Sequence, residues 1–275
     1  MSMGELIIDG GEVVAALSKS EIDMQIATAR AFPRDLPACI AQATQIATRN
    51  VDTAISMFYC LPRADKDIEG PSIRLAEVVA YCWTNMRVES RIVSVDHKFV
   101  TAQGTAFDIE RNVAARGECK RRITYKNGSR FSDDMIQTTA NAACAIALRE
   151  AIFKVVPRFI VNEIMDKAKR ASVGEANELG MNIQKCLDHF QKIGVSPDVI
   201  FNWLGVETQQ EITAEHLVKL RGTWTAIKDG EVTKDEAFNL EPSKPEKKVS
   251  ASKVSKPAKG ELFEDGPQDA VEQGM

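Results

Sequence analysis

The chain contains 275 residues, of which 44% are hydrophobic and 27% charged, and its formal net charge is −4. This length allows one large domain together with a smaller one, and the hydrophobic fraction is sufficient for a folded core. No apolar run reaches the roughly 18 residues that a membrane-spanning helix needs. The N-terminus also lacks the basic segment and cleavage site of a secretion signal. We therefore expect a cytoplasmic protein without a membrane partner.

The cysteine and histidine residues argue against a disulfide framework and against a metal site. Six cysteines are spread along the chain without a CxxC pair, and the three histidines are far apart in the sequence. Disulfide and metal frameworks need recognisable spacings. We expect the cysteines to act as small apolar residues and the protein to carry no metal or other cofactor.

The first seventy residues are expected to form two helices after a flexible lead at 1–17. Ser18 and Glu21 have the spacing of a capping box, which predicts a helix up to Phe32. A second helix is expected from Leu36 to Phe58, followed by a charged connection over residues 63–69. Gly70-Pro71 then interrupts the chain, and Ser72 is expected to cap a helix over 72–86.

The centre of the chain predicts a sheet covered by one helix. Residues 89–124 alternate with period two, which indicates three antiparallel strands, and Gly104 marks either a bulge or a close backbone approach. From Asp133 the pattern becomes helical up to Pro157, with a face of small residues that would pack closely on a sheet. The expected fold class is α+β: a helix, a three-stranded antiparallel meander and a long covering helix, with one sheet face left open.

Positive charge collects on the third expected strand and just beyond it. Between Arg111 and Arg130 there are seven basic residues against one acid, Glu118, which gives a local charge of +6 in an acidic chain. Such a concentration is typical of a surface that binds a polyanion. Arg116, Lys120 and Arg122 share one face of the strand, so we expect them to contact phosphates; an ordinary solvated face remains the alternative.

Further candidates lie outside this strand. Arg149, Lys154 and Arg158 lie in a mostly apolar helical stretch and are expected to emerge at one edge, where they either line a groove or only solubilise the surface. Arg74 either forms a structural ion pair with Glu77 or a neighbouring acid, or contacts DNA, and the contact with DNA is the interpretation kept. Aromatic rings hold single strands by base stacking; Tyr125 and Phe131 are the better candidates, whereas Phe99 and Phe107 are expected in the core. The candidate DNA-binding residues are Arg74, Arg111, Arg116, Lys120, Arg122, Tyr125, Lys126, Arg130, Arg149, Lys154 and Arg158.

The C-terminal part separates into a helical module and a tail. The expected DNA-binding core covers 18–170, and residues 171–240 form a small helical module with eleven acidic and six basic residues, a poor candidate for phosphate contacts. Residues 241–275 lack hydrophobic periodicity and are expected to be disordered, with a basic half at 241–259 and an acidic half at 260–275. This tail is either a solvated linker or an interaction segment that competes for the DNA site.

Several segments resemble a group of bacteriophage recombination proteins: AFPRDL at 31–36, LPR at 61–63, GPSIRLAE at 70–77, and the helix at 141–149 that leads to Val-Val-Pro. With the β-β-β-α order, residues 20–240 are similar to phage single-strand annealing proteins of the RecT, Red-beta and Erf group. The resemblance implies single-stranded DNA binding, assembly into rings or helical filaments, and ATP-independent annealing in recombination. It also implies an annealed duplex intermediate and, as partners, a phage exonuclease or a host single-strand binding protein, in the host cytoplasm. The lack of a GxxxxGK[ST] motif agrees with a non-hydrolytic protein.

Two other functions remain open at this point. Asp108, Glu118 and Lys120 give a D-x9-E-x-K pattern on adjacent strands, in which two carboxylates would hold Mg²⁺ and the lysine would help to activate water, as in metal-dependent nucleases. Glu77, on the preceding helix, could supply a further acid. The other possibility is a non-catalytic scaffold for DNA replication or recombination.

Overall fold

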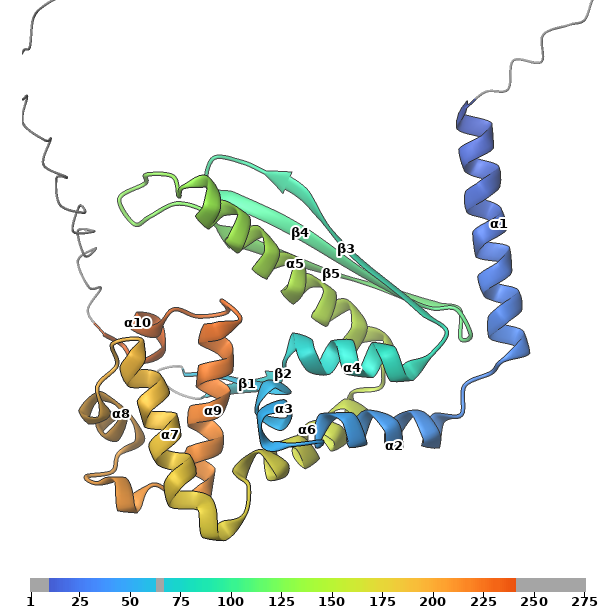
Figure 1. Cartoon of the computed structure of the whole chain (residues 1–275). Helices are drawn as coiled ribbons and strands as arrows, with labels where there is room; N and C mark the ends of the chain where they lie inside the picture. The colour runs from blue at the N-terminus through green and yellow to red at the C-terminus, as the bar shows by residue number, and fades with distance from the viewer. Residues whose placement is uncertain (1–9, 63–66, 241–275) are drawn as a thin grey trace, which may run out of the picture. The chain divides into compact units, whose positions relative to one another are not determined.

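The computed structural model describes residues 10–62 and 67–240, and its central feature is a sheet covered by a long helix (Figure 1). Strands β3 (Met86–Val95), β4 (Phe99–Asp108) and β5 (Val113–Arg122) are antiparallel in the order β3-β4-β5. Helix α5 (Asp133–Val155) lies along one face of this sheet. The expected α+β class, with its meander and covering helix, is confirmed.

The close contact between α5 and the sheet depends on small residues. Gly104 and Gly117 face each other across β4 and β5. A Cβ atom at Gly104 would lie 2.4 Å from the carbonyl carbon and oxygen of Ala147, so α5 contacts the sheet backbone there. Val100, Ala102 and the alanine face of α5 form the buried layer between them. Of the two alternatives given for Gly104, the close backbone approach is confirmed, since Gly104 is in regular register with both neighbouring strands.

The other elements precede the sheet or follow α5 in the chain. Before the sheet come α1 (Gly10–Ala31), α2 (Leu36–Ala47), α3 (Val51–Ser56), β1 (Phe58–Leu61), β2 (Ile68–Pro71) and α4 (Ile73–Trp83). After α5 come α6 (Arg158–Val173), η1 (Ala176–Glu178), α7 (Leu179–Lys192), α8 (Pro197–Leu204), η2 (Gln209–Glu211), α9 (Ala214–Lys228) and α10 (Lys234–Ala237). The predicted cap at Ser72 is present, since its hydroxyl group accepts a hydrogen bond from the backbone N–H of Leu75, and Ser132 caps α5 in the same way through the N–H of Met135. Within the described ranges no helix is both long and apolar enough to span a membrane.

Three local expectations are corrected. Helix α1 already begins at Gly10, so residues 10–17 are helical and Ser18-x-x-Glu21 is not a capping box at a helix start. The flexible lead is therefore wrong for residues 10–17, where Glu12, Ala15, Ala16 and Leu17 favour a helix and no Pro interrupts it. The helix expected from Leu36 to Phe58 is broken, because Asn50 adopts an extended conformation and caps α3 by accepting from Thr53 N. Phe58 and Gly70-Pro71 instead belong to the β1–β2 hairpin, whose four-residue strands are too short to show a period.

The expected division at residue 170 does not separate two units. The described residues, 10–62 and 67–240, fall within one compact unit. The C-terminal helices share a buried cluster with Tyr59 and Leu61 of β1, and Thr225 donates a hydrogen bond to the carbonyl oxygen of Ile55 at 3.1 Å. Helix α9 also lies so close to β1 that a Cβ atom at Gly222 would be 2.9 Å from that of Cys60. The expectations for 1–9 and for the tail at 241–275 lie outside the described residues.

Candidate nucleic-acid interface

The sheet face opposite α5 carries most of the predicted phosphate-binding residues, and we call it the open face. On β4 the buried side chains alternate with half-exposed ones, and cross-strand partners share a face. The strand pairing therefore assigns to the open face Arg87, Glu89, Arg91, Phe99, Thr101, Gln103, Thr105, Phe107, Arg116, Glu118, Lys120 and Arg122. Five of these are basic and two are acidic, so the open face has a net charge of +3.

An aromatic ring lies between two of the basic side chains. Phe99 is the cross-strand partner of Arg122, and the neighbouring pair is Thr101 with Lys120. The Lys120 ammonium nitrogen is 4.5 Å from the centre of the Phe99 ring, and the Arg122 guanidinium carbon is 5.6 Å from it. The electron-rich ring face attracts both cations. The half-exposed Phe99 ring thus carries two positive charges over it, on the face of the sheet that α5 leaves uncovered.

The placement of Phe99 and Phe107 in the core was wrong. Both side chains are half-exposed on the open face, because Val100, Ala102 and the other even-numbered residues of β4 take the buried positions. The alternating basic residues of β5 were the signal that could have placed these two rings on the open face. A phenylalanine aligned with alternating basic residues shares their face when the strands are in this register.

The middle of the open face carries one positive and one negative charge, Arg91 and Glu118, which are joined through Gln103 by hydrogen bonds across all three strands. Arg91 donates to the side-chain oxygen of Gln103 at 3.2 Å, and the Gln103 amide nitrogen donates to a Glu118 carboxylate oxygen at 3.2 Å. Glu118 is therefore hydrogen-bonded to Gln103, and it forms no ion pair with Arg116 or Lys120. The alternation predicted for β5 is confirmed.

The predicted DNA-binding residues that flank β5 in the sequence lie at two different ends of the sheet. Arg111 is exposed in the turn before β5, whereas Tyr125, Lys126 and Arg130 are exposed in the segment after it. The Tyr125 ring contacts Phe131 edge-to-face, with centres 4.7 Å apart, and Arg130 donates to the carbonyl oxygen of Asp96 at 3.0 Å. Only the second group extends the basic surface formed by Lys120 and Arg122.

The expectation that Arg149 emerges at an edge was wrong. Its exposed fraction is 5%, its guanidinium forms an ion pair with Glu231, and its guanidinium carbon lies 4.6 Å from the centre of the Tyr59 ring. Burial raises the pKa of Glu231, and Arg149 only partly offsets this effect. Arg149 therefore joins the sheet-covering helix to the C-terminal helices and is not available to DNA.

The remaining basic candidates divide between structural and exposed positions. Arg74, which was kept among the DNA-binding candidates, forms the structural ion pair that was its alternative, with Asp229 at 3.0 Å and not with Glu77. Lys154 is exposed and donates to the carbonyl oxygen of Arg116 at 2.8 Å, so it lies beside β5. Arg158 is exposed near the ring of Phe153. Of the edge group, Lys154 and Arg158 remain accessible.

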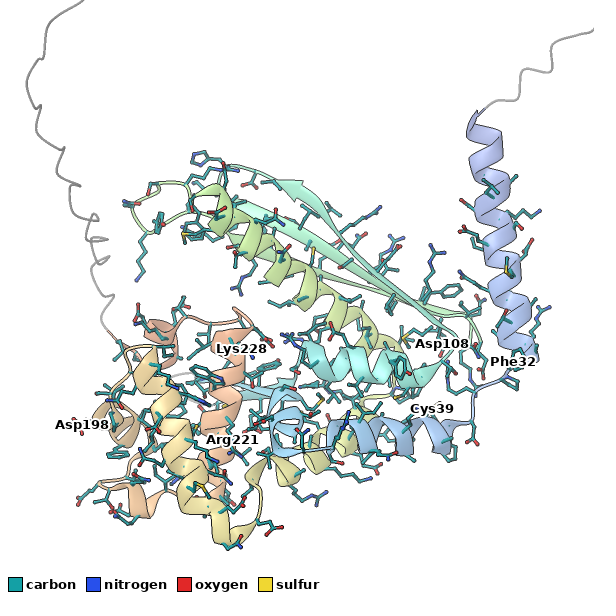
Figure 2. The ribbon with its side chains drawn as sticks, viewed as in Figure 1. Phe32, Cys39, Asp108, Asp198, Arg221 and Lys228 are labelled. Atoms are coloured by element: carbon teal, nitrogen blue, oxygen red, sulfur yellow. The ribbon has the colours of Figure 1, made fainter. Side chains whose placement is uncertain are left out.

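The D-x9-E-x-K pattern does not form a site. Asp108 is buried at the end of β4 (Figure 2), where its carboxylate accepts hydrogen bonds from Arg34 at 2.9 and 3.0 Å, from Trp83 Nε1 at 3.0 Å and from Arg111 N at 3.1 Å. Burial alone would raise its pKa, but these donors outweigh it and the pKa is lowered. Both carboxylate oxygens are already occupied by protein donors.

The second acid of the pattern is also misplaced. Glu118 pairs with Gln103, five residues along β4 from Asp108, which corresponds to about 17 Å. The two carboxylates lie on opposite faces of the sheet, since Asp108 takes a buried position and Glu118 an exposed one. In the described ranges no cluster of three metal-ligating side chains exists. The nuclease site that the sequence left open as an alternative is not assembled.

Comparison of the chain with protein-family models, curated proteins and solved structures finds no match. The likeness to the phage annealing group therefore remains a resemblance of sequence segments and element order.

Proposed function

We propose that the open face binds single-stranded DNA and that the chain anneals complementary strands without ATP. The observation that carries this proposal is the position of Lys120 and Arg122 over the Phe99 ring, on a face of net positive charge in an acidic protein. Cations beside an aromatic surface match a nucleotide strand, because phosphates attract the cations while bases stack on the ring.

The architecture suits annealing because one sheet face is closed and the other is accessible. Helix α5 fills the first face down to the backbone of Gly104 and Gly117, so a strand would have to lie on the open face. Backbone contacts fix a strand without reading its sequence. Pairing of the bases then supplies the free energy of the reaction, and no nucleotide hydrolysis is required.

Assembly into a homo-oligomer belongs to the same proposal. Strand β3 pairs with β4 only, within the described part of the chain, and it exposes Val88, Ile92, Val93 and Val95. An unpaired strand edge with apolar side chains favours association with another copy, and a head-to-tail contact produces rings or open helices. The proposed setting is phage recombination in the host cytoplasm, with a partner exonuclease or host single-strand binding protein.

The proposal is tested by pairing two complementary labelled oligonucleotides in EDTA without ATP. We expect the wild type to accelerate pairing and the Arg116→Ala/Lys120→Ala/Arg122→Ala variant to lose most of this effect. A matched control replaces three exposed basic residues outside the sheet, Arg49→Ala/Arg170→Ala/Lys192→Ala, and so changes the net charge equally. DNA binding without accelerated pairing would support the non-catalytic scaffold instead, and absence of DNA binding would refute both.

A further inference from the structure

A second basic feature lies among the helices, in a pocket of about 510 Å³. Helices α3, α7 and α9 supply most of its lining, and no residue of the open face contributes. On α9, Arg221, Thr225 and Lys228 fall at helical spacing on one face, and Figure 2 marks the first and last of them. On α7, Asn182, Lys185 and His189 do the same.

Arg221 is the unusual residue of this pocket. Its exposed fraction is 6%, and its Nη1 atom is buried without a hydrogen-bond partner. Its guanidinium forms no hydrogen bond or ion pair with any residue that the structure describes. Buried arginine side chains are normally paired, because removing an unpaired charge from water is strongly unfavourable. An unpaired one at the wall of a pocket therefore points to an anion that occupies the pocket.

The carboxylates near Arg221 do not form an ion pair with its guanidinium. Asp229 gives one carboxylate oxygen to Arg74 at 3.0 Å, while its Oδ2 atom has no partner. Asp52 is exposed on α3 and attracts Arg221 only at longer range. Lys185 and Lys228 add two exposed cations to the lining. The lining of the pocket has a net charge of +1. Its basic residues are Arg74, Lys185, Arg221 and Lys228, and its acidic residues are Asp52, Glu178 and Asp229.

We propose that this pocket binds a phosphate group, with the Arg221 guanidinium as the main donor and the lysines Lys185 and Lys228 as supporting charges. A guanidinium suits a phosphate because its planar N–H groups match two oxygens at once. The phosphate could belong to a free mononucleotide or to the 5′ end of a DNA strand, two sources with the same recognised chemistry. The proposal does not rest on the annealing function of the open face.

Binding is measured by calorimetry on the full chain carrying the Arg116→Ala/Lys120→Ala/Arg122→Ala substitutions, so that the open face does not contribute. The probes are inorganic phosphate, thymidine 5′-monophosphate, thymidine, and an oligonucleotide with either a 5′-phosphate or a 5′-hydroxyl. We expect saturable binding of phosphate-bearing probes and none of thymidine. Binding only of the 5′-phosphorylated oligonucleotide also supports the site and identifies a strand end as the source.

Two substitutions locate the binding. Arg221→Met keeps the length of the side chain and removes the charge, and we expect it to weaken binding at least tenfold. Lys185→Ala/Lys228→Ala changes exposed residues only, so it tests the site even if Arg221→Met fails to fold, and Lys192→Ala on the same helix α7 is the control. Equal affinity for thymidine and its monophosphate, or phosphate binding that neither variant weakens, would overturn the proposal.

Discussion

Gly104 and Gly117 face each other on adjacent strands, and Ala147 of α5 lies directly against both. A Cβ atom at Gly104 would be 2.4 Å from Ala147 backbone atoms, and one at Gly117 would be 2.5 Å from the Ala147 carbonyl oxygen. The backbone of α5 therefore rests on the sheet, with no room for a side chain between them. This contact decides which face of the sheet can bind a ligand.

Gly104→Ala should destabilise the fold by about 1–3 kcal/mol, because α5 must move away from β4 to accept the methyl group. The control is Gly180→Ala in α7, where nothing lies within 4 Å of the new Cβ atom. There, alanine should be neutral or stabilising by up to about 1 kcal/mol through its better helix propensity. Urea unfolding of both variants measures the difference, and equal stabilities would contradict the close contact.

The open face should determine the salt dependence of DNA binding. Each phosphate contact to a single strand contributes about 0.7 to the slope of log K against log salt. Arg116→Ala/Lys120→Ala/Arg122→Ala should therefore flatten the slope by about two units, equally for different sequences. The Arg49→Ala/Arg170→Ala/Lys192→Ala control should leave it unchanged. If the slope of the Arg116→Ala/Lys120→Ala/Arg122→Ala variant equals that of the wild type, the DNA does not bind along β5, and Lys154 and Arg158 are the next residues to test.

Phe99 should contribute to single-strand binding by base stacking. Phe99→Leu keeps an apolar side chain under Lys120 but removes the ring, and we expect a loss of about 1–3 kcal/mol of binding free energy. Phe159→Leu is the matched control, since Phe159 is exposed on α6 and belongs to no part of the sheet. Fluorescence anisotropy with a labelled oligonucleotide measures both. Equal affinities for the two variants would remove stacking on Phe99 from the proposal.

The sequence was sufficient for the sheet and its covering helix, because ten-residue strands and a 23-residue helix repeat their periods several times. It was insufficient for the β1–β2 hairpin, whose strands have four residues each. The faces of β5 were predicted from its alternating charges, but the register that brings Phe99 beside Arg122 depends on the pairing of two strands. Local patterns predict which side chains share a face of one strand, whereas neighbouring strands must be paired before a site is complete.

Arg149 shows the same limit for charged residues. The helix around it predicted an exposed edge, because a basic residue in an apolar helix usually reaches solvent. Its partner Glu231 is 82 residues further along the chain, and nothing in the local pattern indicates this pair. Arg74 with Asp229 and Arg121 with the carbonyl oxygens of Gly230 and Glu231 belong to the same long-range contact.

This contact leads to the last prediction. Arg149→Met should cost about 3–5 kcal/mol of folding free energy near pH 8, because it leaves Glu231 buried and charged without its partner. Burial raises the pKa of Glu231 above its ordinary value of 4.5, and loss of Arg149 should raise it further. Protonated Glu231 thus favours the folded state; this contribution is complete below pH 4.5 and is lost as the pH rises through the folded-state pKa.

The cost of Arg149→Met should accordingly shrink as the pH falls from 8 towards 5, since a protonated carboxyl group needs no cationic partner. Urea unfolding of wild type and variant at several pH values measures this difference directly. Adding Glu231→Gln removes the titrating group, so the double variant should be less destabilised near pH 8 and should show no such pH dependence relative to wild type. A cost of Arg149→Met that stays constant between pH 5 and 8 would mean that lost packing against Tyr59, and not the unpaired carboxylate, destabilises the variant.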